Sequence, residues 1–188
     1  MIDYRKARSK IANGDVIAFH YARRSLFSQL ISLWTRSRIS HVGLVMRVNG
    51  RVAVIEALEG WGVRVYPISR ILSSGRQIEW YALRPGVDRR EIVHEALAHW
   101  GQRYASPWQF IRSFSVLTKW TLDKWGIRND ISTKRFFCSE FVAHCLKAGG
   151  LEDDTAPSLM APADICELDC LERKGKLVWK NSGSAPAA

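Results

Sequence analysis

One cysteine of the chain has a residue type and a position that suit nucleophilic chemistry. Cys138 opens a stretch whose apolar residues recur at a spacing near 3.6 residues up to Gly149, which predicts an amphipathic helix that begins at the cysteine. The first turn of a helix carries unpaired N–H groups and the positive end of the helix dipole, and both favour a thiolate. Lys134 and Arg135, just upstream, add to this bias. Cys138 is therefore a candidate nucleophile, and the alternative is a small buried thiol, which is what most free cysteines are.

A predicted β-hairpin places a histidine beside a glutamate. Two β-rich runs flank Asn49-Gly50, the strongest short signal for a two-residue hairpin turn. Counting back from this turn puts Gly43 opposite Glu56, with His41 two residues along on the same face. His41 and Glu56 are then diagonal neighbours about 7–8 Å apart at the backbone, a gap that their side chains can close over the space that Gly43 leaves empty. The alternatives are a core histidine bonded to backbone and a strand-end glutamate in water.

These three residues are the parts of a cysteine-nucleophile triad. His41 would hold the Cys138 thiolate as an ion pair and later protonate the leaving group, while Glu56 would orient the imidazolium. The backbone N–H of Cys138 would be one donor to the oxyanion. Attack on an amide or ester carbonyl would give an acyl-enzyme, which water or another acceptor would resolve.

Length and composition fit a globular protein. The chain has 188 residues, of which 47% are hydrophobic, and we expect one domain over residues 1–180 with a disordered tail over 181–188. No apolar run reaches the about 20 residues of a membrane span, and the N-terminus is polar and basic. We therefore expect a cytoplasmic protein. Nothing in the sequence indicates an oligomeric state.

The net charge of +10 favours an anionic partner. Peptidoglycan, an acidic membrane surface and nucleic acid all qualify, but no Gly-rich phosphate loop or nucleic-acid motif supports the last of them. A predicted helix over residues 108–125 combines tryptophans with lysines, which suits an interfacial helix that contacts a membrane. The alternative for this helix is a core position with a solvated basic edge.

The four cysteines do not indicate disulfides or a metal site. They lack paired C-x-x-C spacing, so reduced thiols are expected. Cys166 and Cys170 lie four residues apart, as on one helical turn. A zinc site that combined them with Cys138, Cys145 or His144 would have the wrong spacing for common structural sites. We therefore expect no metal and no cofactor.

Hydrophobic periodicity and turn signals predict an α+β protein with a mostly antiparallel sheet. The predicted elements are a helix over 4–12, a strand over 16–20, a helix over 23–34, hairpin strands over 40–48 and 51–57, strands over 61–66 and 77–83 joined through a short helix or turn over 68–72, a helix over 88–100, a loop over 101–104, the helices over 108–125 and from 138, and a last strand over 176–180.

Five segments, in their order along the chain, resemble a known family. Gly14–Phe19, Ser40–Val45, Val54–Ala57, Phe137–Val142 and Ala161–Asp164 are similar to the circularly permuted, papain-like branch of the NlpC superfamily, in which the histidine strand precedes the cysteine helix. The resemblance spans most of the chain. The combination of S-H-V-G with C-S-E-F-V is more specific than either piece.

The resemblance implies a permuted papain-like fold, with an antiparallel sheet packed against helices and the nucleophile at a helix N-terminus. Carried over position by position, it makes Cys138 the nucleophile, His41 the base and Glu56 the third polar residue. It also implies an amidase or peptidase, often one that acts on cell-wall peptides. Such an enzyme would reach the cell wall by phage or specialised secretion. Relatives that act on lipid esters or transfer acyl groups share this core, so a lipid acyltransferase or lipase is an alternative, and a non-catalytic domain that binds an anionic polymer is another.

Overall fold

A computed structural model describes residues 1–20, 37–104, 135–152, 155–157 and 160–179. The predicted helices over 23–34 and 108–125 and the expected tail over 181–188 lie outside the described residues. The boundary of a single domain at residue 180 therefore stays a prediction.

The described residues contain one large sheet in the order β1-β9-β6-β2-β3-β4-β5. Every neighbouring pair in it is antiparallel except β1 and β9, which are parallel, so the predicted mostly antiparallel sheet is confirmed. Its strands are β1 (Ile2–Asp3), β2 (Val16–His20), β3 (Ile39–Val48), β4 (Arg51–Leu58), β5 (Gly62–Pro67), β6 (Ile78–Leu83) and β9 (Leu171–Val178).

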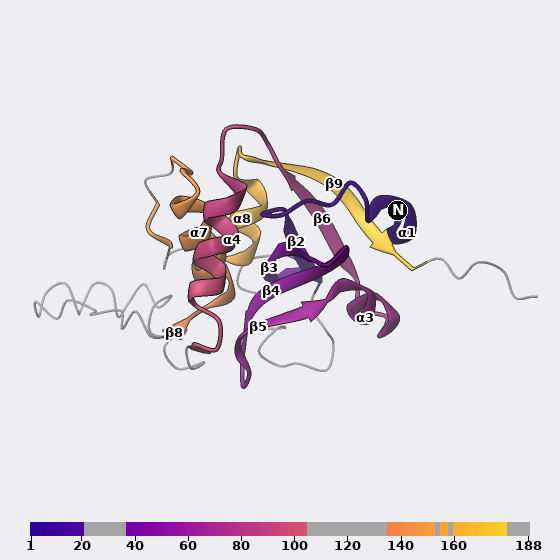
Figure 1. Ribbon diagram of the computed structural model, residues 1–188, viewed down its shortest axis with the longest axis horizontal. Coiled ribbons are helices and arrows are strands. Elements are labelled where there is room, and N and C mark those ends of the chain that lie inside the picture. The colour runs from indigo at the N-terminus through magenta and orange to yellow at the C-terminus, as the bar shows by residue number, and fades with distance from the viewer. Residues whose placement is uncertain (21–36, 105–134, 153–154, 158–159, 180–188) are drawn as a thin grey trace, which may run out of the picture.

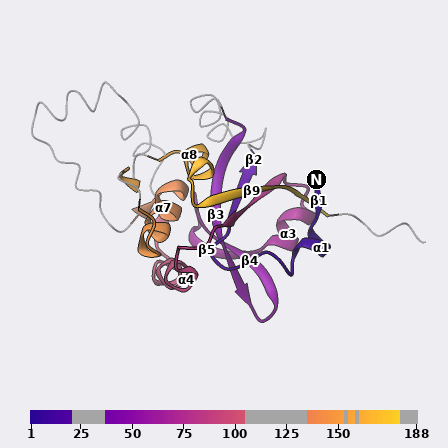
Figure 2. The same ribbon diagram turned by 90° about the horizontal axis from the view of Figure 1, so that it is seen from above.

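Helices cover both faces of this sheet, as Figures 1 and 2 show. On one face lie α4 (Arg89–Ala98), α7 (Cys138–Ala148) and α8 (Pro162–Glu167); on the other lie α1 (Tyr4–Ala7) and α3 (Ile68–Ser73). Alternation along the strands gives each face its own apolar core. In β2, for example, Val16 and Ala18 pack toward α7 and α8, while Ile17 and Phe19 pack toward α1 and α3. The predicted α+β class is confirmed.

The predicted hairpin and its register are confirmed. Asn49 and Gly50 both have positive φ, of 47° and 75°, as a type I′ turn requires. Val48 pairs with Arg51, and the ladder between β3 and β4 continues to Leu44 opposite Ile55. One further step places Gly43 opposite Glu56, as expected.

Helix α4 and helix α7 run side by side, and their packing is close at one end (Figure 1). The N–H of Asp88, which caps α4, donates to the carbonyl oxygen of Gly149 after α7 at 2.7 Å. A Cβ atom at Gly149 would lie 2.5 Å from Ile92, so only glycine permits this approach. The end of α7 is therefore held against the start of α4.

Some predicted boundaries were wrong. The first helix ends at Ala7 rather than residue 12, because the N–H of Ala12 donates to the Asp15 carboxylate instead of continuing the helix. Cys166 and Cys170 do not share a helical turn, since Leu168 is extended after α8 and the Cys170 carbonyl accepts from Arg84.

Two further differences come from pairing over long sequence distances. The last strand begins at Leu171 rather than 176, because it pairs with β6 along the whole length of that strand. The predicted loop over 101–104 contains β7 (Arg103–Tyr104), which pairs in parallel with β8 (Arg135–Phe136) just before α7. Neither pairing leaves a signal in the local sequence.

Asp15 joins β2, β6 and α4 through one buried carboxylate. Its Oδ1 accepts from the Leu83 N–H and from Arg89, at 3.0 and 2.8 Å, and its Oδ2 accepts from the Trp80 indole and the Ala12 N–H, at 2.8 and 3.0 Å. The residue is buried. It therefore accepts hydrogen bonds from four donors that belong to different parts of the fold.

Asp15→Ala should lower the free energy of unfolding by about 3–5 kcal/mol, because it leaves three N–H donors without their acceptor and the partly buried Arg89 guanidinium without its carboxylate partner. Asp3→Ala is the control. The Asp3 carboxylate caps α1 through the Arg5 N–H, and its loss should cost about 1 kcal/mol. Urea unfolding of both variants measures the difference, and equal losses would contradict the role assigned to Asp15.

Candidate active site

Helix α7 begins at Cys138, as predicted. Phe137 precedes it in an extended conformation, and its N–H donates to Oε2 of Glu140 at 3.3 Å, which closes the first turn. The cysteine therefore occupies the first helical position. There the backbone N–H groups have no partner within the helix.

The Cys138 sulfur is buried and surrounded by hydrogen-bond donors. Burial alone would raise the pKa of this thiol, but the charge and hydrogen bond of His41 and the backbone N–H groups of Val42 and Ser139 outweigh it and lower the pKa. Val42 lies on β3, in the part of the strand that pairs with β2 but not with β4. Strand β3 and the first turn of α7 thus both stabilise a thiolate.

His41 bridges the sulfur and a carboxylate. Its Nε2 donates to Oε2 of Glu56 at 2.7 Å, and its ring lies close enough to the Cys138 sulfur for the two groups to shift each other's pKa. Because Glu56 engages Nε2, Nδ1 is the nitrogen left to face the sulfur. Burial opposes protonation of the ring, but the negative charges of Cys138 and Glu56 prevail and raise the pKa of His41 to about 9. The histidine is then an imidazolium at neutral pH.

Gly43 leaves the room that the His41–Glu56 pair needs. A Cβ atom at this position would lie 2.6 Å from Val54 and 3.1 Å from the Cβ of Glu56. The hydrogen bond spans a diagonal of the sheet, as the hairpin register predicts. Glu56 is only 1% exposed, so the alternative of a strand-end charge in water is wrong.

Arg64 on β5 holds the other oxygen of Glu56. Its Nε and Nη2 donate to Oε1 at 3.1 and 2.9 Å, directly across the strand pair. Burial would raise the pKa of Glu56, but His41 and Arg64 together lower it. The guanidinium also lies 5.4 Å from the Trp61 ring and 4.9 Å from the Tyr66 ring. Arg64 was not among the site residues predicted from the sequence; the alternation of side chains along β5 would have indicated it once β5 was paired with β4.

The structure brings all three predicted residues together, although they come from β3, β4 and α7. The result is a connected series of thiol, imidazole, carboxylate and guanidinium, in which the pKa of the thiol is lowered and the pKa of the imidazole is raised. Such an arrangement can supply a nucleophile at neutral pH and a proton for a leaving group.

The other cysteines have different surroundings. Burial raises the pKa of the Cys145 thiol, and it raises that of Cys166 to about 12. Neither therefore resembles Cys138. Among the described residues, the cluster that could hold a metal ion contains His144 but none of the four cysteines, so the zinc combination considered from the sequence is not formed.

A match to a known protein family shows which family this chain belongs to. Residues 10–165 match the C92 peptidase family, described as a permuted papain-like amidase enzyme family of the YaeF/YiiX type. The chain belongs to the C92 family. This supports a cysteine peptidase or amidase at family level and confirms the resemblance to permuted papain-like enzymes.

A solved structure supports the fold of this C92 family chain. The crystal structure of YiiX from Escherichia coli O157:H7, described as a metalloprotein, matches it with a TM-score of 0.62 and 20% sequence identity, over 89% of this chain and 98% of YiiX. The permuted papain-like fold is thereby confirmed. No curated protein matches the chain. Within the described ranges, none of the helices has the length and apolar character needed to cross a membrane.

Cys138 should react with iodoacetamide well below pH 8.5, near which an ordinary thiol titrates, because the pKa of Cys138 is lowered. Cys145 and Cys166 should stay unlabelled there, since burial raises the pKa of both. Peptide mass spectrometry after labelling across a pH series distinguishes the three thiols.

His41→Gln provides the comparison for this labelling. It removes the group that lowers the Cys138 pKa most, so the labelling profile should move to higher pH. An unchanged profile would show that His41 does not stabilise the thiolate.

Proposed function

We propose that this C92 family chain is a cysteine amidase in which Cys138 is the nucleophile, His41 the acid and base, and Glu56 the residue that orients His41. One observation carries the proposal. The His41 ring is hydrogen-bonded to Glu56 and lies beside Cys138, and the pKa of His41 is raised while the pKa of the Cys138 thiol is lowered. These are the states that an acyl-transfer reaction through a thiolate requires.

The first half of the reaction forms a thioester. The Cys138 thiolate attacks the carbonyl carbon of the substrate, and the charge that develops on oxygen is stabilised by the Cys138 N–H at the start of α7. The proton on His41 passes to the amide nitrogen, the C–N bond breaks, and the amine leaves. Glu56 keeps the ring oriented as its charge changes.

The second half restores the enzyme. Neutral His41 takes a proton from water, whose oxygen attacks the thioester carbonyl, and the Cys138 thiolate leaves. The released acid and the restored thiolate–imidazolium pair complete the cycle. No external cofactor is needed for these steps to balance.

The substrate class we propose is a peptide amide derived from peptidoglycan. The net charge of +10 supports it, since the cell wall is an anionic polymer, and so does the family's description as an amidase. Residence in the cytoplasm and delivery to a cell wall both stay predictions. The lipid and acyl-transfer alternative was based on relatives that share the core, on the net charge and on the predicted helix over 108–125, which lies outside the described residues.

Cys138→Ala should abolish release of amines from purified peptidoglycan peptides, and Glu56→Gln should lower kcat by about 10²- to 10⁴-fold because His41 loses its orienting charge. Glu79→Gln is a matched control. Glu79 is also a buried sheet glutamate bonded to a histidine and an arginine, namely His20 and Arg173.

Comparing kcat of Glu56→Gln with kcat of Glu79→Gln distinguishes a catalytic effect from a structural one. Glu79→Gln should change kcat little, since its described partners include neither Cys138 nor His41. Equal losses in both variants would contradict the role proposed for Glu56. Turnover of phospholipid esters, with no hydrolysis of peptide amides, would contradict the amidase assignment.

A further inference from the structure

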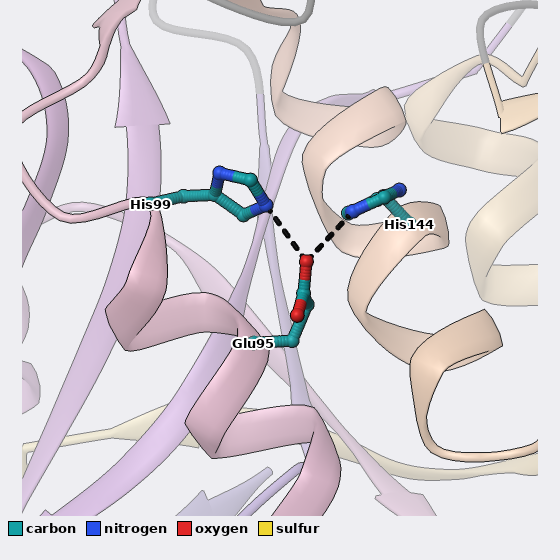
Figure 3. Close-up of side chains that lie close together, drawn as sticks. All are labelled: Glu95, His99 and His144. Carbon is teal, nitrogen blue, oxygen red and sulfur yellow. Dashed lines mark hydrogen bonds and ion pairs between the residues drawn. The ribbon is translucent and has the colours of Figure 1, made fainter.

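Three side chains with metal-binding atoms meet between α4 and α7 (Figure 3). Oε1 of Glu95 lies 2.9 Å from Nε2 of His99 and 2.9 Å from Nε2 of His144. The three atoms all lie within 4.8 Å of one another. Glu95 and His99 are four residues apart and so share one face of α4 and its cap, while His144 faces them from α7.

The donor set is one that divalent transition metals prefer. Two imidazoles and one carboxylate bind zinc in sites that keep a fourth position open, and the same combination binds other ions that favour nitrogen and oxygen ligands. Tetrahedral bonds of about 2.0–2.2 Å place donor atoms roughly 3.3 Å apart. The 2.9 Å separations therefore need only a small expansion to admit an ion.

The surroundings would let an ion enter and would hold its ligands in place. The side chains of His99, Glu95 and His144 are 15%, 29% and 43% exposed, so the cluster is open to solvent on one side. The helices that carry it are fixed to each other through Gly149 and Asp88. Rigid helices preorganise the ligands, which lowers the cost of binding.

We propose that Glu95, His99 and His144 form a binding site for Zn²⁺ or a similar divalent transition-metal ion, with a fourth position for water. The ion would link α4 to the helix that begins with Cys138. The site is separate from the thiol, because His144 follows Cys138 by six residues, which is about 9 Å along the helix axis. This inference goes beyond the proposed amidase activity and does not depend on it.

Calorimetric titration with ZnCl₂ tests the site. The protein is the full chain without a polyhistidine tag, stripped of metal, and all variants carry Cys138→Ala so that the thiol cannot bind zinc. We expect saturable binding of one ion per chain. Glu95→Gln and His144→Gln should each weaken binding by more than about tenfold, since each removes a ligand.

His94→Gln is the matched control, because His94 lies on the same helix but is exposed and outside the cluster. It should bind zinc like the parent. Circular dichroism of the metal-free variants establishes that they fold, and His99→Gln replaces any that does not.

Co²⁺ provides an independent probe of the ligands. The Co²⁺ complex should show the visible absorption of a site with nitrogen and oxygen donors and no thiolate charge-transfer band. The proposal is overturned by absence of saturable binding, by undiminished binding in folded ligand variants, by equal loss in His94→Gln, or by a thiolate band from Cys145, Cys166 or Cys170.

Discussion

The interaction between the buried side chains of Cys138 and His41, whose pKa values shift toward a thiolate and an imidazolium, is the one on which the rest of the site depends. Each charge is unfavourable alone in a buried position, and burial acts against both ionised forms. The pair persists because further charges and dipoles support it on each side. Glu56 and then Arg64 extend it across β4 and β5, while the N–H groups of Val42 and Ser139 support the sulfur.

The fold provides these partners through two different constraints. The two-residue turn at Asn49-Gly50 sets the register that brings His41 and Glu56 together, and Gly43 keeps the space between them open. The position of α7 brings the thiol to β3. The same helix is held at its far end by α4, and the Glu95, His99 and His144 cluster lies between these two ends. A bound ion would therefore reinforce the packing that places Cys138.

Local sequence signals predicted most of the described fold and the three central site residues. The turn at Asn49-Gly50 determines a register by counting, and Cys138 stands at a helix start marked by periodicity, so their environments could be inferred without coordinates. Arg64 could not be assigned, because its role depends on the pairing of β5 with β4. The contact of His144 with Glu95 and His99 was likewise beyond reach, since it depends on how two helices 40 residues or more apart in sequence pack. The helix boundary missed at Ala12 and the helical turn expected for Cys166 and Cys170 were decided by tertiary hydrogen bonds or backbone geometry that local propensity does not record.

The protonation state of His41 tests the central ion pair most directly. An NMR titration of protein labelled with ¹⁵N-histidine should show that His41 titrates with a pKa of about 9 in the natural sequence. In Cys138→Ala the pKa should fall, because the thiolate charge is lost while burial remains. A His41 that titrates at or below about 6.5 with Cys138 present, or whose pKa is the same in both proteins, would contradict the account.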